Sequence, residues 1–177
     1  AVLINVPGKL NMVNSTITGN RQAVIVRAGT ANLTGCTINA DTHALSSTEH
    51  AYAVSSEKWG TGNRVSYGAL IVGNSTTAYP NDAAVTLENC TLQANETSLT
   101  TGSVVAPVYA LYAVRNKTDY KTTVVMDVDT KENITGTVAK DGDKATITVD
   151  GQPYADPAET TNDELQPVNE PAPEDKA

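Results

Sequence analysis

An internal repeat constrains the fold of this chain more than any other sequence feature. Three ten-residue segments, 11–20, 32–41 and 86–95, align without gaps. Each has an apolar residue at its second and seventh positions, an Asn or Gly at its fourth and a Thr at its sixth. Asn and Gly adopt a left-handed backbone most readily. The pattern therefore predicts two short strands joined by a one-residue bend, because the tight turn of an antiparallel hairpin needs two residues.

Aliphatic runs precede two of these segments. Residues 23–26 come before the second copy and residues 69–72 before the third, while the run 110–114 precedes a more divergent strand at 123–126. The most compact unit, 21–41, has 21 residues. This is the length of one coil of a parallel β-helix, in which each coil buries its inner face by stacking on its neighbours.

The pattern V-T-L-E-N-C-T-L at Val85 to Leu92, with its sister copies, resembles a coil of the right-handed parallel β-helix proteins (the pectin-lyase-like superfamily). The resemblance covers about residues 10–139 and implies an all-β, right-handed parallel β-helix. Composition agrees, since 40% of the residues are hydrophobic, only 5% are aromatic, and Phe is absent. An antiparallel β-sandwich is the main competing fold.

The repeat predicts one β-helix domain, residues 1–154, with about four coils and a long inserted loop. We place the coils at residues up to 20, 21–41, 67–95 and about 108–139, and the insertion at 42–66. A turn at 141–143 would then lead into a last strand at 144–150, which would cover an open sheet edge.

The net charge of −8 is concentrated at the C-terminus. Residues 155–177 hold seven acidic residues, one Lys and four Pro, so this segment carries −6. A segment this polar cannot offset its ordering entropy by burial. We expect an acidic, Pro-rich linker or tail, and we expect the chain to be a piece of a longer polypeptide.

The remaining residues, 1–154, are nearly neutral. Nucleic-acid binding requires clustered Lys and Arg, and a membrane helix requires about 18 consecutive apolar residues. The sequence has neither feature. We therefore expect no nucleic-acid partner and no membrane span, and the oligomeric state is not predicted.

The candidate binding residues lie in and beside the insertion 42–66. It contains Tyr52, the only Trp of the chain (Trp59) and Arg64, and Tyr67 follows it. Loops on a rigid scaffold often carry function, and an aromatic platform with a charged rim can stack against a sugar. The alternative is that these rings pack the loop onto the body of the protein.

No metal or cofactor is expected. His43 and His50 are seven residues apart on no evident helix. Asp127 and Asp129 alternate on an expected strand near Glu132 and could hold Ca²⁺, although a solvated outer face is the favoured interpretation.

Cys36 and Cys90 occupy the same repeat position. In neighbouring parallel coils their side chains would point the same way, which does not suit a disulfide. We expect buried free thiols and no zinc site.

Catalytic motifs are missing. Hydrolases of the polygalacturonase type have N-T-D, D-D, G-H-G and R-I-K motifs, and this chain has none of them. Arg27 and Arg115 follow their strands at similar places and would make only a short basic stripe.

The sequence therefore favours a non-enzymatic, extracellular or cell-surface β-helix module. It would be an adhesin or stalk that presents loops to carbohydrate or a host surface. The alternatives are a fragment of a polysaccharide lyase or glycoside hydrolase, and a structural fibre of the phage or autotransporter type.

Overall fold

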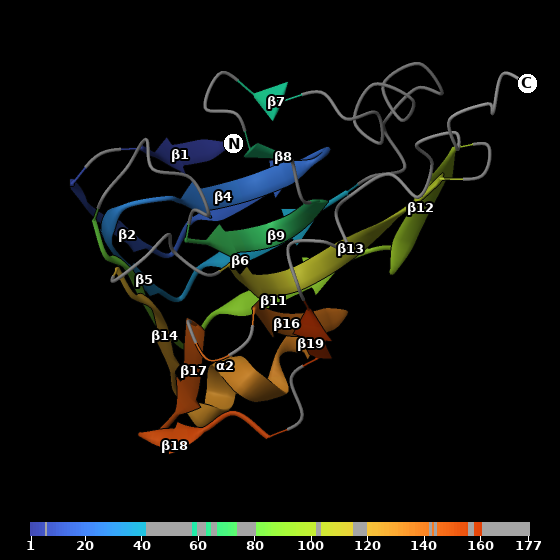
Figure 1. Ribbon diagram of the computed structural model, residues 1–177. Coiled ribbons are helices and arrows are strands. Elements are labelled where there is room, and N and C mark those ends of the chain that lie inside the picture. The colour runs from blue at the N-terminus through green and yellow to red at the C-terminus, as the bar shows by residue number, and fades with distance from the viewer. Residues whose placement is uncertain are drawn as a thin grey trace, which may run out of the picture.

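The computed structural model describes residues 1–5, 7–41, 58–59, 63–64, 67–73, 81–101, 104–114, 120–141, 143, 145–155 and 158–160. Their strands form three larger sheets, here named A, B and C, in which most neighbouring strands are parallel (Figure 1). Most of the predicted tail (residues 156–157 and 161–177) and most of the insertion 42–66 lie outside the described residues.

Sheet A contains six parallel strands in the order β1, β4, β9, β13, β16 and β19. Their bounds are β1 Val2–Ile4, β4 Gln22–Val26, β9 Tyr67–Val72, β13 Val104–Ala113, β16 Thr137–Asp141 and β19 Ala158–Thr160. A further strand, β12 (Ser98–Thr101), pairs antiparallel with β13.

Sheets B and C continue the same passage of the chain. Sheet B contains β2 Lys9–Val13, β5 Gly29–Thr34, β10 Ala83–Glu88, β14 Thr122–Met126 and β17 Ala145–Val149, with the antiparallel strand β18 Gln152–Pro153 at its edge. Sheet C contains β3 Thr16–Gly19, β6 Thr37–Ala40, β11 Thr91–Ala94 and β15 Ile134–Thr135.

The chain passes through sheets A, B and C in turn and then begins again, and we call each passage a layer. Layer 1 is β1, β2 and β3, layer 2 is β4, β5 and β6, layer 3 is β9, β10 and β11, and layer 4 is β13, β14 and β15. β16 and β17 begin a fifth layer. This all-β, mostly parallel arrangement is compatible with the predicted β-helix, and the parallel pairing does not fit the antiparallel sandwich.

The gapless repeat alignment is confirmed as strand register. Thr16 pairs with Thr37, which in turn pairs with Thr91, and the neighbouring apolar positions follow the same order. The predicted one-residue bends are also confirmed, because Asn14, Gly35 and Asn89 have φ angles of 50°, 61° and 49°. The left-handed residue turns the chain from sheet B into sheet C in three successive layers.

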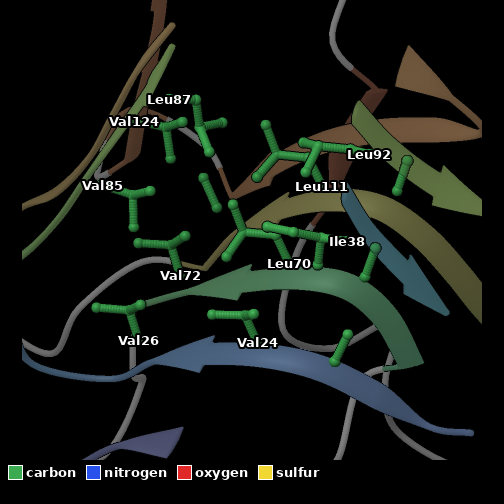
Figure 2. Close-up of a cluster of buried hydrophobic side chains, with 14 of the residues drawn as sticks. Val24, Val26, Ile38, Leu70, Val72, Val85, Leu87, Leu92, Leu111 and Val124 are labelled. Carbon is green, nitrogen blue, oxygen red and sulfur yellow. The ribbon is translucent and has the colours of Figure 1, made fainter. Parts of the chain in front are cut away.

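The core lies between the three sheets. Aliphatic side chains from each sheet point toward one another, for example Val24 and Leu70 from sheet A, Val85 from sheet B and Ile38 from sheet C (Figure 2). These four side chains are at most 1% exposed. The apolar seventh position of the repeat, which Ile38 occupies, therefore faces the core.

The strands β4 and β9 of sheet A are buried on both faces. Ile25 lies between the inward-facing Val24 and Val26, so it points to the opposite face, where it belongs to a second apolar cluster. The members of this cluster are Ile25, Ile71, Tyr109, Tyr112, Val114 and Ala139. A parallel sheet covered on both faces has continuous hydrophobic strands, which explains the aliphatic runs seen in the sequence.

Two expectations differ from the structure near the C-terminus. Asp127 and Asp129 do not alternate on a strand, because residues Val128–Glu132 form the short helix α2 and Asp127 is its N-cap. Asp141, expected to begin the turn at 141–143, belongs to β16 instead, and residue 142 lies outside the described residues. The last strand is confirmed at Ala145–Val149, where it pairs parallel with β14 and is covered by β18.

Three residues of the segment expected to be a tail have a place in a sheet. Ala158–Thr160 form β19, which pairs parallel with β16. Backbone hydrogen bonds to an existing sheet edge do not require apolar side chains, so a polar segment can add a strand there.

Candidate functional site

The predicted binding residues are not brought together on one described surface. Tyr52 lies outside the described residues. Trp59 and Arg64 lie in a two-stranded antiparallel hairpin, β7 (Lys58–Trp59) and β8 (Asn63–Arg64), of which only the backbone is described.

Tyr67 does not belong to a surface platform. Its side chain is 0% exposed and belongs to the apolar core, at the start of β9. Desolvation by burial raises the pKa of its hydroxyl, and the charge of Arg21 opposes this only in part. Assigning Tyr67 to the binding surface was wrong, because the aliphatic strand begins at Tyr67 itself and its ring faces inward.

The described residues instead line an open groove at the corner where the chain passes from sheet A to sheet B. The groove has a volume of about 510 Å³. Its lining residues are Pro7, Gly29, Asn81, Asp82 and Tyr120. Gly29 is the first residue of β5, and the others come from the segments that lead into β2, β10 and β14, so four successive layers contribute to one groove.

Backbone hydrogen bonds between layers fix this corner. Thr30 N–H donates to the carbonyl of Gly8, and Gly29 N–H donates to the carbonyl of Asp82, at 2.9 and 2.8 Å. Gly29 has φ +87°, and a Cβ there would overlap the backbone of Gly8. The close approach of the first two layers therefore requires glycine.

Asp82 is the charged group among the described residues that line the groove. Its side chain is exposed, and its Oδ1 accepts a hydrogen bond from Lys121 N–H at 2.8 Å. Asn81 and Tyr120 are half-buried beside it. Both of these residues lie two positions before a paired residue, Ala83 in β10 and Thr122 in β14, so they occupy equivalent positions in neighbouring layers.

Sequence reasoning missed this groove although a signal was present. Its lining residues precede or begin the strands of sheet B, whereas the predicted binding residues lie in and beside the longer insertion before β9. Aligning the layers on Gly29, Ala83 and Thr122 would have placed Asn81 beside Tyr120.

A smaller groove lies on the outer face of sheet B. It has a volume of about 340 Å³ and is lined by Asn32, Leu33, Thr34, Thr86 and Glu88. Asn32 donates a side-chain hydrogen bond to Asn11 at 3.0 Å, along the stacking direction.

The carboxylate of Asp127 is used structurally. Its Oδ1 accepts from Thr130 N–H and its Oδ2 accepts from Asn89 N–H, both at 2.8 Å. Desolvation tends to raise the pKa of Asp127, but the hydrogen bonds from Thr130 and Asn89 outweigh it and the pKa is lowered. Asp129 and Glu132 are exposed on α2. Within the described ranges, no group of three or more His, Cys, Asp or Glu residues could hold a metal ion.

Cys36 and Cys90 are buried free cysteines, as predicted. The thiol of Cys90 donates to the carbonyl of Leu33 at 3.2 Å, and that of Cys36 donates to the carbonyl of Met12 at 3.5 Å. Burial raises the pKa of Cys90. Each thiol thus fills a small position in the stack and bonds to the layer before it.

The predicted basic stripe is described at one end only. Arg27 is 7% exposed and donates to the side chain of Asn5 at 3.4 Å, whereas Arg115 lies outside the described residues. In the part of the chain that the structure describes, no helix is both long and apolar enough to cross a membrane.

Comparison of the chain with protein-family models, with curated proteins and with solved structures finds no match.

Proposed function

We propose that the chain is a right-handed parallel β-helix module of the pectin-lyase-like type, carried by an extracellular or cell-surface protein. It acts without catalysis, as an adhesin or stalk that presents its corners and loops to carbohydrate or a host surface. One observation carries the proposal: successive layers repeat in register, so residues at one corner form a continuous surface along the stack.

The stacked sheets suit a presenting scaffold. Their strands are bonded layer to layer by backbone hydrogen bonds, and their core is filled by aliphatic side chains. Corners of such a stack can carry connections of different lengths while the strands keep their register. The long stretch of sequence between β6 and β9, which belong to successive layers, is an example. Function then lies in the corners and loops.

The chemistry of the described acidic residues favours binding over catalysis. A polysaccharide hydrolase needs paired carboxylates that face the substrate. In this chain Asp127 is committed to the cap of α2, and Asp82 is the only charged residue among the described residues that line the larger groove. A single fixed carboxylate is suited to accepting hydrogen bonds from sugar hydroxyls.

Binding and turnover can be tested on the same material. The whole chain is incubated on a glycan array, and the polysaccharides represented there are then assayed for new reducing ends and for the unsaturated products of a lyase. We expect retained glycans without release of product. Product release would overturn the non-enzymatic assignment, and failure to bind any glycan or host-cell surface would overturn the adhesin assignment.

The mass of the protein in solution distinguishes the adhesin from the remaining alternative, a structural fibre. We expect a species whose light-scattering mass is not that of a stable trimer. A stable trimer would favour the structural fibre over the adhesin.

A further inference from the structure

We infer that the groove at the corner between sheets A and B binds an extended, uncharged oligosaccharide, which stacks on Tyr120 and is held by hydrogen bonds to Asp82 and Asn81. This inference rests on the proposed function and adds to it a site and a ligand class. The residues that carry it are not those of the insertion 42–66, in and beside which the sequence predicted the binding residues.

The shape of the groove favours an extended ligand. Pro7 comes from layer 1, Gly29 from layer 2, Asn81 and Asp82 from layer 3, and Tyr120 from the segment that enters β14 in layer 4. Three strand spacings separate the first layer from the fourth, which is about 14 Å. A monosaccharide cannot contact all of these residues, whereas several linked sugar units can lie along the stack.

Tyr120 supplies an aromatic surface at one end of the groove. The residue is half-buried and lines the groove, so part of it remains accessible there. An amphipathic ring of this kind buries the apolar C–H face of a sugar at little entropic cost and keeps its hydroxyl available for a hydrogen bond. Pro7 adds a second apolar contact at the other end.

Asp82 supplies a pre-oriented acceptor in the middle of the groove. The bond from Lys121 N–H to Oδ1 holds the carboxylate, and its backbone carbonyl is held by Gly29 N–H. A carboxylate has about four acceptor sites, so the fixed group can still accept from sugar hydroxyls. The amide of Asn81 has both donors and an acceptor and therefore complements the same hydroxyls.

The charge of the groove selects against acidic sugars. Asp82 is the only charged residue among the described residues that line it, and it is negative. The carboxylate of Asp82 would repel the carboxylates of a polyuronate bound in the groove, whereas it would accept hydrogen bonds from neutral hydroxyls. We therefore expect neutral hexose or pentose oligomers to bind more tightly than oligogalacturonate of the same length.

The test uses isothermal titration of the whole chain with cellohexaose, xylohexaose, mannohexaose and hexagalacturonate, extended to the neutral glycans retained on the array. Tyr120→Ala should weaken binding of the retained neutral glycan by about tenfold or more, because the stacking surface is lost. Tyr120→Phe should restore most of that loss. Asp82→Asn should weaken binding by about tenfold, since a charge-assisted acceptor becomes neutral.

Two further variants serve as controls. Asp129→Asn removes an exposed carboxylate on α2, which is not among the residues of the groove, and should leave the affinity unchanged. Trp59→Ala reports on the insertion. Thermal unfolding verifies that each variant is folded, and Asp82→Asn keeps an oxygen that can accept from Lys121 N–H.

Each outcome decides the inference. Loss of neutral-glycan affinity in Tyr120→Ala and Asp82→Asn, with none in Trp59→Ala, supports it. Binding that is lost only in Trp59→Ala overturns the groove and leaves the proposed function standing. Preference for hexagalacturonate overturns the uncharged ligand class. The absence of any glycan binding overturns this inference, and only the absence of host-cell binding as well overturns the adhesin assignment.

Discussion

Single residues are constrained here by their position in the repeat. Gly35 shows this most clearly, because it has φ +61° and a Cβ at this position would overlap Asn14 Oδ1 of the layer before. Gly151 also has a positive φ of +79°, but nothing lies within 4 Å of the same point. The pair therefore separates conformational strain from steric overlap.

We expect Gly151→Ala to lower the free energy of unfolding by about 1–2 kcal/mol, the cost of a left-handed alanine. Gly35→Ala should cost more, because Asn14 must also move. Urea unfolding of both variants measures the difference. Equal losses would show that the side chain of Asn14 yields without cost.

Inward positions of the repeat can be tested at Ile38, which is 0% exposed. Ile38→Asn places an amide without a partner among aliphatic side chains and should cost on the order of 2–4 kcal/mol. Val13→Asn is the matched control, since Val13 is 60% exposed. If Ile38→Asn melts like the parent chain, the core assigned to these sheets is wrong.

At the scale of the elements, α2 is tied to the bend of the layer before it. Thr130 is 0% exposed, and its Oγ1 accepts from Cys90 N–H at 2.9 Å. Asp127 caps the helix and accepts from Asn89 N–H at the same bend. The helix therefore satisfies backbone donors that β15, with two residues, does not reach.

This contact makes part of the stability depend on pH. Because the hydrogen bonds lower the pKa of Asp127 below its ordinary value of 3.8, its contribution is present above that value and is lost as the pH falls through the lowered pKa. Asp127→Asn should therefore destabilise the chain at pH 7 and do so much less at pH 2–3. Denaturant unfolding at both values measures this, with Asp129→Asn as the control on the same helix.

The sequence predicted the parts of the fold in which local pattern and layer register agree. The alternation around Ile38 and the bends at Asn14 and Asn89 follow from residue type alone. The helix α2 does not follow from residue type alone, because the sequence V-M-D-V-D at 125–129 alternates like a strand. The hydrogen bond that decides it joins Asp127 to Asn89, 38 residues away. The groove was missed for a similar reason, since Asn81 and Tyr120 become neighbours only when the layers are aligned.

At the scale of the whole molecule, the two cysteines report on the integrity of the stack. Both are buried, and the raised pKa of Cys90 keeps its thiol protonated at neutral pH. We expect no reaction with an aromatic disulfide reagent in the folded protein and two reactive thiols per chain in urea, appearing together with unfolding. Rapid labelling of either thiol under native conditions would contradict the burial of Cys36 and Cys90 in the core.

The direction of the hydrogen bonds has a mechanical consequence. The strands of layer 1 form one end of all three sheets, and β15, β18 and β19 form the other. Backbone hydrogen bonds between layers therefore point along the line that joins these ends. Tension applied along that line opens the bonds one after another instead of shearing a whole strand at once. A longer protein that contained this stack would therefore have a link that lengthens stepwise, layer by layer, when it is pulled along that line.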